Sequence, residues 1–144
     1  MDTPPGGPYL DSIMPQLRLI HIALCLGAAI VALVLGAMHS LMPDTAVELP
    51  TLLPWVFLGF SAVMLLSAAA FRTTIAPADT AMGEEAWLTE NRGKGIVLWA
   101  LCESSVVLAA LAFFCGASTL IAGVLAAGGL GFMASQSPGT LAGH

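Results

Sequence analysis

Four long apolar stretches limit what this chain can fold into more than any other feature. They cover about residues 17–38, 52–71, 95–115 and 118–134, and the last is the shortest and rich in glycine. The hydrocarbon core of a bilayer requires about 20 apolar residues in a spanning helix. We therefore expect an all-α protein, with four transmembrane helices packed as a bundle over residues 17–134.

Composition agrees with a membrane protein. Of the 144 residues, 58% are hydrophobic and only 9% are charged, and the mean hydropathy is +0.91. A soluble domain has about 25% charged residues. With four basic residues in all, the chain offers no patch that could follow a phosphate backbone, so nucleic acid is excluded as a partner. The segments between the apolar stretches are too short for a catalytic domain, and we expect no enzymatic activity.

The two ends of the chain are predicted to be tails. Residues 1–16 are rich in proline and glycine without periodicity, which predicts little fixed structure, and residues 135–144 follow the last apolar stretch. The first apolar stretch is longer than the roughly 7–15 residues of a signal-peptide core, so we expect a retained helix rather than a cleaved leader.

The central loop carries signals for a short helix of its own. Asp79 or Thr80 is typical of a helix start and Gly93 of a helix end. Trp87 and Leu88 within it predict a surface helix seated at the lipid headgroups, where an indole ring is favoured.

All four basic residues flank helix ends that would share one side of the membrane. Arg18 begins the first helix, Arg72 follows the second, and Arg92 and Lys94 precede the third. Cytoplasmic loops carry an excess of lysine and arginine. The N-terminus, the central loop and the C-terminus are therefore predicted to be cytoplasmic, and the link that contains Val47 to face outward.

Glu103 is the one acidic residue within residues 95–115. It lies eight residues after Gly95, which places it roughly 12 Å inside the hydrocarbon at about 1.5 Å per residue. An acidic side chain near the middle of a spanning helix costs about 2.5–3.5 kcal/mol on insertion scales. We therefore expect Glu103 to face the bundle, where it has a partner or is protonated.

The predicted partner of Glu103 is His21, which enters the membrane from the same side. By helical spacing Arg18, His21 and Cys25 share one face of the first helix. Together these positions predict an intramembrane polar seam of Arg18, His21 and Glu103.

Three interpretations of this seam stay open. The first is a buried His–Glu hydrogen bond that determines which helix faces meet. The second is a proton relay or ion site, because such residues recur in transport pathways. The third is a metal site of His21, Cys25, Cys102 and Glu103, whose spacing matches no established motif, so we expect neither a metal nor a cofactor.

Small residues indicate where the helices pack. Close contact rather than exclusion of water drives helix association in lipid, and small residues at four-residue spacing mark contact faces. Gly27 and Gly36 in the first helix and Gly123 and Gly131 in the fourth are the predicted contact positions. Gly116 predicts a tight turn between the third and fourth helices.

Ser104 and Ser105 follow Glu103 without a base or an orienting acid suited to nucleophilic catalysis. Serines in spanning helices more often donate to a carbonyl of their own helix. We expect that role here.

A set of positions in the first helix and around the third forms a recognisable pattern: Leu17, Arg18, His21, Ala23, Leu24, Gly27, Arg92, Ala100, Leu101 and Glu103. This pattern resembles a family of small four-helix bacterial membrane proteins without an assigned activity. In that family a glycine usually follows the glutamate, where this chain has Ser104. The resemblance implies a multi-pass protein of the bacterial inner membrane in which His21 and Glu103 carry whatever is specific.

Two functions are compatible with these features. The first is a non-enzymatic accessory or partner-binding subunit with a buried His–Glu pair, whose partners besides lipid are other membrane subunits or further copies of this chain. The alternative follows from a weaker resemblance to the proteolipid c subunits of rotary ATPases, in which the second helix of a hairpin carries an ion-binding carboxylate. It is translocation of protons or cations at Glu103, although the polar loop motif of those subunits is absent here.

Overall fold

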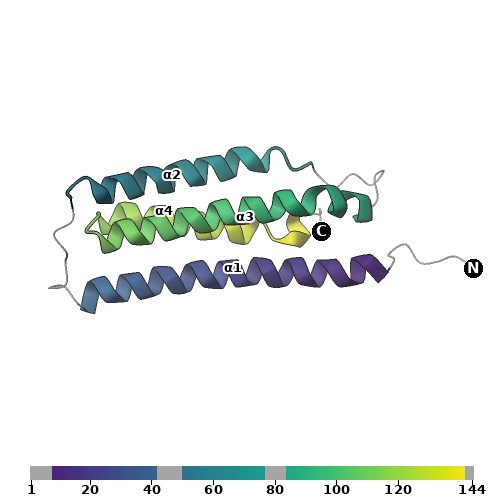
Figure 1. Cartoon of the computed structure of the whole chain (residues 1–144), viewed down its shortest axis with the longest axis horizontal. Helices are drawn as coiled ribbons and strands as arrows, with labels where there is room; N and C mark the ends of the chain where they lie inside the picture. Colours follow the sequence, from purple (N-terminus) through teal and green to yellow (C-terminus); the bar gives the residue numbers. More distant parts are fainter. Residues whose placement is uncertain (1–7, 42–49, 77–83, 142–144) are drawn as a thin grey trace, which may run out of the picture.

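The structure is a computed structural model that describes residues 8–41, 50–76 and 84–141, and within these residues every regular element is a helix, without strands. The helices are α1 (Pro8–Leu41), α2 (Leu53–Arg72), α3 (Glu84–Phe114), α4 (Thr119–Ser135) and the short α5 (Pro138–Leu141). Figure 1 shows the four long helices side by side, with α3 between α1 and α2. Because α3 also packs against α4, it is the central helix of the bundle.

Among the described residues, three helices are long and apolar enough to cross a membrane. They contain the candidate spans Ile13–Leu41, Leu53–Arg72 and Ala86–Phe114, whereas α4 is a shorter apolar helix of 17 residues. The prediction of a helical protein with helices long enough to span a membrane is therefore confirmed.

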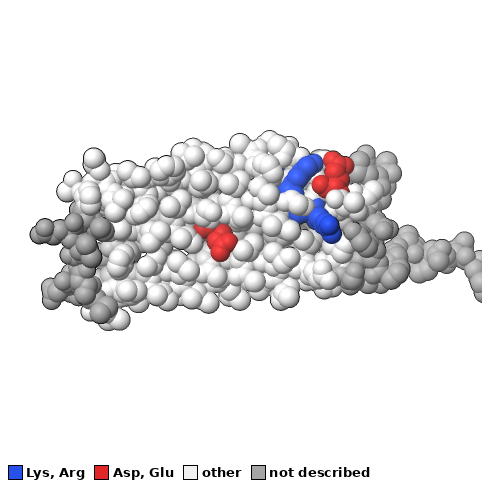
Figure 2. Space-filling view, viewed as in Figure 1, with Lys and Arg blue, Asp and Glu red and all other residues white. Residues whose placement is uncertain are grey.

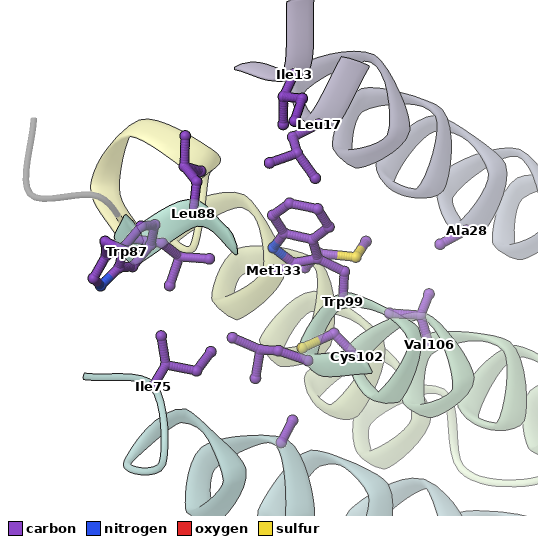
Figure 3. Close-up of a cluster of buried hydrophobic side chains, with 13 residues drawn as sticks. Ile13, Leu17, Ala28, Ile75, Trp87, Leu88, Trp99, Cys102, Val106 and Met133 are labelled. Atoms are coloured by element: carbon purple, nitrogen blue, oxygen red, sulfur yellow. The ribbon is translucent and has the colours of Figure 1, made fainter. Parts of the chain in front are cut away.

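The first helix begins earlier than its apolar stretch. The expectation of a tail without fixed structure up to residue 16 is wrong from Pro8 onward, because α1 is already helical there and includes Pro15. Proline is tolerated in the first helical turn, which accounts for Pro8. Ile13 and Leu17 are buried in the same cluster as Trp99 of α3, and this burial holds the extra turns in place (Figure 3).

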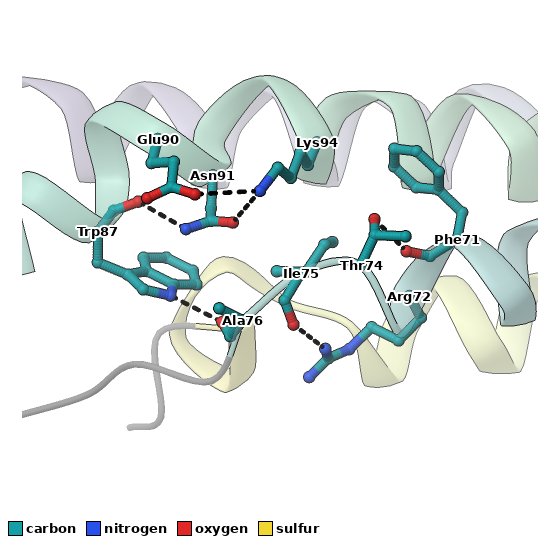
Figure 4. Close-up of polar contacts among 9 residues, drawn as sticks. All are labelled: Phe71, Arg72, Thr74, Ile75, Ala76, Trp87, Glu90, Asn91 and Lys94. Atoms are coloured by element: carbon teal, nitrogen blue, oxygen red, sulfur yellow. Dashed lines mark hydrogen bonds and ion pairs between the residues drawn. The ribbon is translucent and has the colours of Figure 1, made fainter.

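The predicted surface helix is not a separate element. Gly93, expected to end it, lies inside α3, and Trp87 and Leu88 are 4% and 1% exposed rather than seated on lipid. Trp87 Nε1 donates to Ala76 O over 2.8 Å, and Asn91 Nδ2 donates to Trp87 O over 3.1 Å (Figure 4). Burying two large side chains contributes several kcal/mol, which outweighs the roughly 1 kcal/mol cost of a glycine in a helix.

One end of the bundle, which we call the charged end, carries Arg72, Arg92 and Lys94. There α1 begins and α5 ends (Figure 1), and the basic side chains gather with acidic ones (Figure 2). Lys94 Nζ lies 3.4 Å from Glu90 Oε1 and donates to Asn91 Oδ1 over 3.1 Å.

The segment between α4 and α5 closes the charged end. Gln136 accepts twice: its backbone oxygen from Trp99 Nε1 over 2.7 Å, and its side-chain Oε1 from Arg72 Nε over 2.6 Å. Leu141 is buried beside Gly95, where a Cβ on the glycine would lie 3.5 Å from Leu141 Cδ1. The predicted C-terminal tail therefore includes a short helix, α5, that packs against the end of the bundle.

The opposite end, which we call the hairpin end, contains the predicted tight turn between α3 and α4. Gly116 has φ +94°, and its N–H donates to Phe113 O while the N–H of Ala117 donates to Ala112 O, both over 2.9 Å. These two bonds form a Schellman motif, which satisfies the last carbonyls of α3.

A groove of about 210 Å³ lies between α1, α3 and α4 toward the hairpin end. Its walls are mostly small residues: Ala32 and Gly36 from α1, Ala109 and Ala110 from α3, and Gly123 and Ala126 from α4.

Candidate functional site: the face around Glu103

Glu103 lies at the seam between α1 and α3, inside a candidate membrane span. Its side chain is half-buried, and a Cβ built on Gly27 of α1 would lie 3.7 Å from Glu103 Oε1. Gly27 thus leaves room for the carboxylate beside α1. Figure 2 shows acidic atoms midway along the molecule, over this seam, separated from the charged side chains at the charged end by uncharged surface.

The Glu103 carboxylate has no hydrogen bond or ion pair with any residue of the described part of the chain. Its oxygens are also not fully enclosed, because no enclosed side-chain oxygen or nitrogen among the described residues lacks a partner. An acid at this depth is therefore open to a group from outside the bundle.

His21 is not the partner of Glu103. It is buried, and its Nε2–H donates to Met133 O of α4 over 2.9 Å, while its ring packs on Trp99 with centroids 4.9 Å apart. Glu103 lies against Gly27, six residues and about 9 Å further along α1 than His21. This axial offset is the reason that the predicted His–Glu pair does not form.

Arg18 does not complete the predicted seam either. Its side chain is exposed on α1, and within the described ranges no hydrogen bond or ion pair joins it to His21 or Glu103. Cys25 Sγ lies 3.8 Å from His21 Nε2. Over the described residues, no group of three or more His, Cys, Asp or Glu side chains is arranged to hold a metal ion.

The packing glycines lie elsewhere than predicted, with one exception. Gly27 faces Glu103, but a Cβ on Gly36, Gly123 or Gly131 would meet nothing within 4 Å, so these three are not contact positions. The close contact of α3 with α4 is instead at Gly129, where a Cβ would lie 2.8 Å from Val106 Cγ2. The face of α4 that contacts α3 is therefore about two residues away from the predicted face. Small residues occur on all sides of α4, so their spacing did not show which side makes the contact.

A serine pair joins α2 to α3 and was missed by the sequence reasoning. Ser61 Oγ donates to Ser105 O over 2.8 Å, and Ser105 Oγ donates to Ser61 O over 2.9 Å, with both residues fully buried. Ser104 does donate to Ala100 O of its own helix over 2.8 Å, as expected, whereas the same expectation for Ser105 is wrong because Ser105 donates to α2. A serine in each of two apolar stretches was the available signal for the interhelical pair.

His39 is a second residue that sequence reasoning left without a role. Its Nδ1 lies 3.3 Å from Phe114 O, the last carbonyl of α3, and its ring packs on Phe113 with centroids 4.6 Å apart. Both histidines of α1 thus bond to carbonyls in the last turn of a neighbouring helix, where carbonyls lack intrahelical partners.

Comparisons of this chain with protein-family models, with curated proteins and with solved structures find no match. The resemblance to small four-helix bacterial membrane proteins therefore stays a prediction.

Proposed function

We propose that this chain is a non-enzymatic, multi-pass protein of the bacterial inner membrane that acts as a partner-binding subunit of a larger membrane assembly. The observation that carries the proposal is Glu103: a carboxylate halfway along a spanning helix, without a partner in the described residues and open at the seam of α1 and α3.

The free energy of this arrangement favours a partner from another molecule. A carboxylic acid exposed to hydrocarbon is neutral or draws water inward, and intramembrane acidic side chains usually face a bundle interior. Here His21, the partner predicted within the bundle, is instead bonded to Met133 O. A second protein that supplied a polar group at this seam would complete the missing contact.

The orientation of the protein is part of the proposal. Arg72, Arg92 and Lys94 at the charged end support a cytoplasmic location for that end, and hence for both termini, by the positive-inside rule. A single cysteine at Val47, outside the described residues, should then react with a membrane-impermeant maleimide in intact cells. One at Glu85, in the first turn of α3, should react only after lysis, and the reverse pattern would invert the orientation.

The main experiment is site-specific photocrosslinking in cells that naturally make the protein. A photoreactive residue at Ala100, exposed one turn from Glu103, should give a discrete adduct whose second component mass spectrometry identifies. The same residue at Leu120, which is 75% exposed on α4, is the matched control and should give lipid adducts only. The Ala100 adduct should disappear with Glu103→Gln, and its absence in the parent protein would refute the proposal.

Proton or cation translocation at Glu103 is the second candidate. It is favoured by the place of an unpartnered carboxylate within a candidate span, because acidic side chains inside spans recur in proton and ion pathways. Proteoliposomes of the purified chain test it: a proton or sodium flux that Glu103→Gln abolishes would support this candidate. A flux that is absent, or that Glu103→Gln leaves unchanged, would exclude it.

A further inference from the structure

We infer that the partner docks a membrane-spanning helix on the Glu103 face and places a lysine or arginine against the Glu103 carboxylate. We define the Glu103 face as Ala23 and Gly27 of α1 with Ala100 and Glu103 of α3. The inference rests on the proposed function and names the chemistry of the partner.

The shape of this face suits a helix. Ala23 precedes Gly27 by one turn of α1, and Ala100 precedes Glu103 by one turn of α3, so small residues flank the carboxylate on both helices. Ala23 and Ala100 are exposed and Gly27 is half-exposed. Small residues allow two helix backbones to approach closely, which is the usual geometry of helix association in lipid.

The charge of this face specifies a cation. Glu103 is an acceptor when ionised, and it lacks a donor among the described residues. A basic side chain in the same hydrocarbon lacks an acceptor and a counter-charge, and intramembrane charges are found paired with one another. Pairing would remove two insertion penalties at once, whereas an apolar helix would remove neither.

A second copy of this chain does not supply the cation. In copies of the same orientation, residues at the depth of Glu103 meet others at that depth, and this chain has no basic residue there. Arg18 lies nine residues, or about 13 Å, from Gly27, and Arg92 lies eleven residues, or about 16 Å, from Glu103. Arg72 and Lys94 are engaged at the charged end. Charge complementarity therefore points to a different protein.

The test uses a defined probe: a synthetic leucine–alanine transmembrane peptide with one central lysine. Energy transfer from the donor-labelled full-length chain to the acceptor-labelled peptide is measured in phosphatidylcholine vesicles at neutral pH. The lysine peptide should bind about tenfold more tightly than the same peptide with leucine at that position. Moving the lysine seven residues, about 10 Å, toward either end should remove the gain.

Variants of the chain locate the effect. Glu103→Gln, nearly identical in shape, should bind both peptides equally, whereas Glu90→Gln at the exposed charged end should keep the preference for lysine. Equal binding of the two peptides, or a preference that survives Glu103→Gln, would overturn the inference. Tighter binding of a peptide with a central glutamate, or self-association that Glu103→Gln abolishes, would also overturn it by identifying a carboxyl pair.

The two proposals fail separately. A photocrosslinked partner without an intramembrane basic residue would overturn this inference and leave the proposed function standing. Absence of any protein adduct at Ala100 in cells would overturn the proposed function, whatever the peptides show in vesicles.

Discussion

The charged end and the hairpin end of the bundle are packed by side chains of different size. At the charged end, Trp87 and Trp99 are buried (Figure 3) and donate to backbone carbonyls. Leu141 of α5 is buried in the same hydrophobic cluster. At the hairpin end, small residues line a groove of about 210 Å³ between α1, α3 and α4. The first end is closed by large side chains, whereas the second leaves space at the surface.

This difference shows two ways in which helices associate in a membrane protein. A buried tryptophan fills a large volume and its indole N–H donates to a backbone carbonyl, and together these contacts select one arrangement of the helices. Small residues permit close approach of two helices but do not determine one relative rotation, since a small side chain meets the same neighbours over a range of rotations. We expect the charged end to be the more stable half, and substitutions at matched residues test this ranking.

The largest expected effect is at the tryptophans. Trp99→Ala should lower the free energy of unfolding by about 3–5 kcal/mol, because it empties a fully buried site and removes the bond to Gln136 O. Trp55→Ala, at a position 62% exposed at the start of α2, should change it by no more than about 0.5 kcal/mol. Denaturant unfolding in micelles measures both, and equal losses would contradict the comparison.

A pair of glycines in α4 gives the next largest difference. Gly129→Ala should cost about 1–3 kcal/mol, because its Cβ would lie 2.8 Å from Val106 Cγ2 and 3.4 Å from Cys102 O. Gly123→Ala projects into the open groove and should be neutral or stabilising by up to about 1 kcal/mol through helix propensity. Thermal melting of the two variants compares them, and a destabilised Gly123→Ala would show that the groove is filled.

The two histidines of α1 compare the ends directly. His21→Ala should cost about 1–2 kcal/mol, since it removes a buried 2.9 Å bond and a ring contact with Trp99. His39→Ala should cost less than about 1 kcal/mol, because its side chain is half-buried and its bond is 3.3 Å long. A larger loss for His39→Ala in the same unfolding assay would reverse the ranking of the ends.

The smallest expected effect is the coupling of the serine pair between the two ends. Ser61→Ala and Ser105→Ala should each cost about 0.6 kcal/mol, a typical value for such bonds in lipid. The double variant should cost less than the sum, because both donors leave together. Ser61→Ala combined with Ser104→Ala is the control and should be additive, since Ser104 bonds within α3.

The sequence predicted the elements that depend on apolar length alone. The stretches 52–71 and 118–134 match α2 and α4 to within one residue at each end. It failed for α1 and α3, which continue past their apolar stretches. The added turns are held by the burial of Ile13 and Trp87 on distant parts of the chain, and no local signal encodes those contacts.

The candidate site divides in the same way. The sequence placed Glu103 inside a candidate membrane span beside the first helix, and it also indicated the small residue Gly27 as a contact position. The partner of His21 was not predicted correctly. Glu103 lies against Gly27, six residues and about 9 Å along α1 from His21, so the carboxylate is too far along the helix to meet the imidazole.

From the amino-acid sequence alone it followed that this chain is helical, where α2 and α4 begin and end, where the turn at Gly116 falls and that an acidic residue lies within a long apolar stretch. The packing of the helices established which side of each helix meets its neighbour: Gly129 rather than Gly131 against α3, and Met133 rather than Glu103 against His21. The physical reason is that each residue turns a helix by 100°, while a helix that is apolar on all sides has no polar face to show which side is inward.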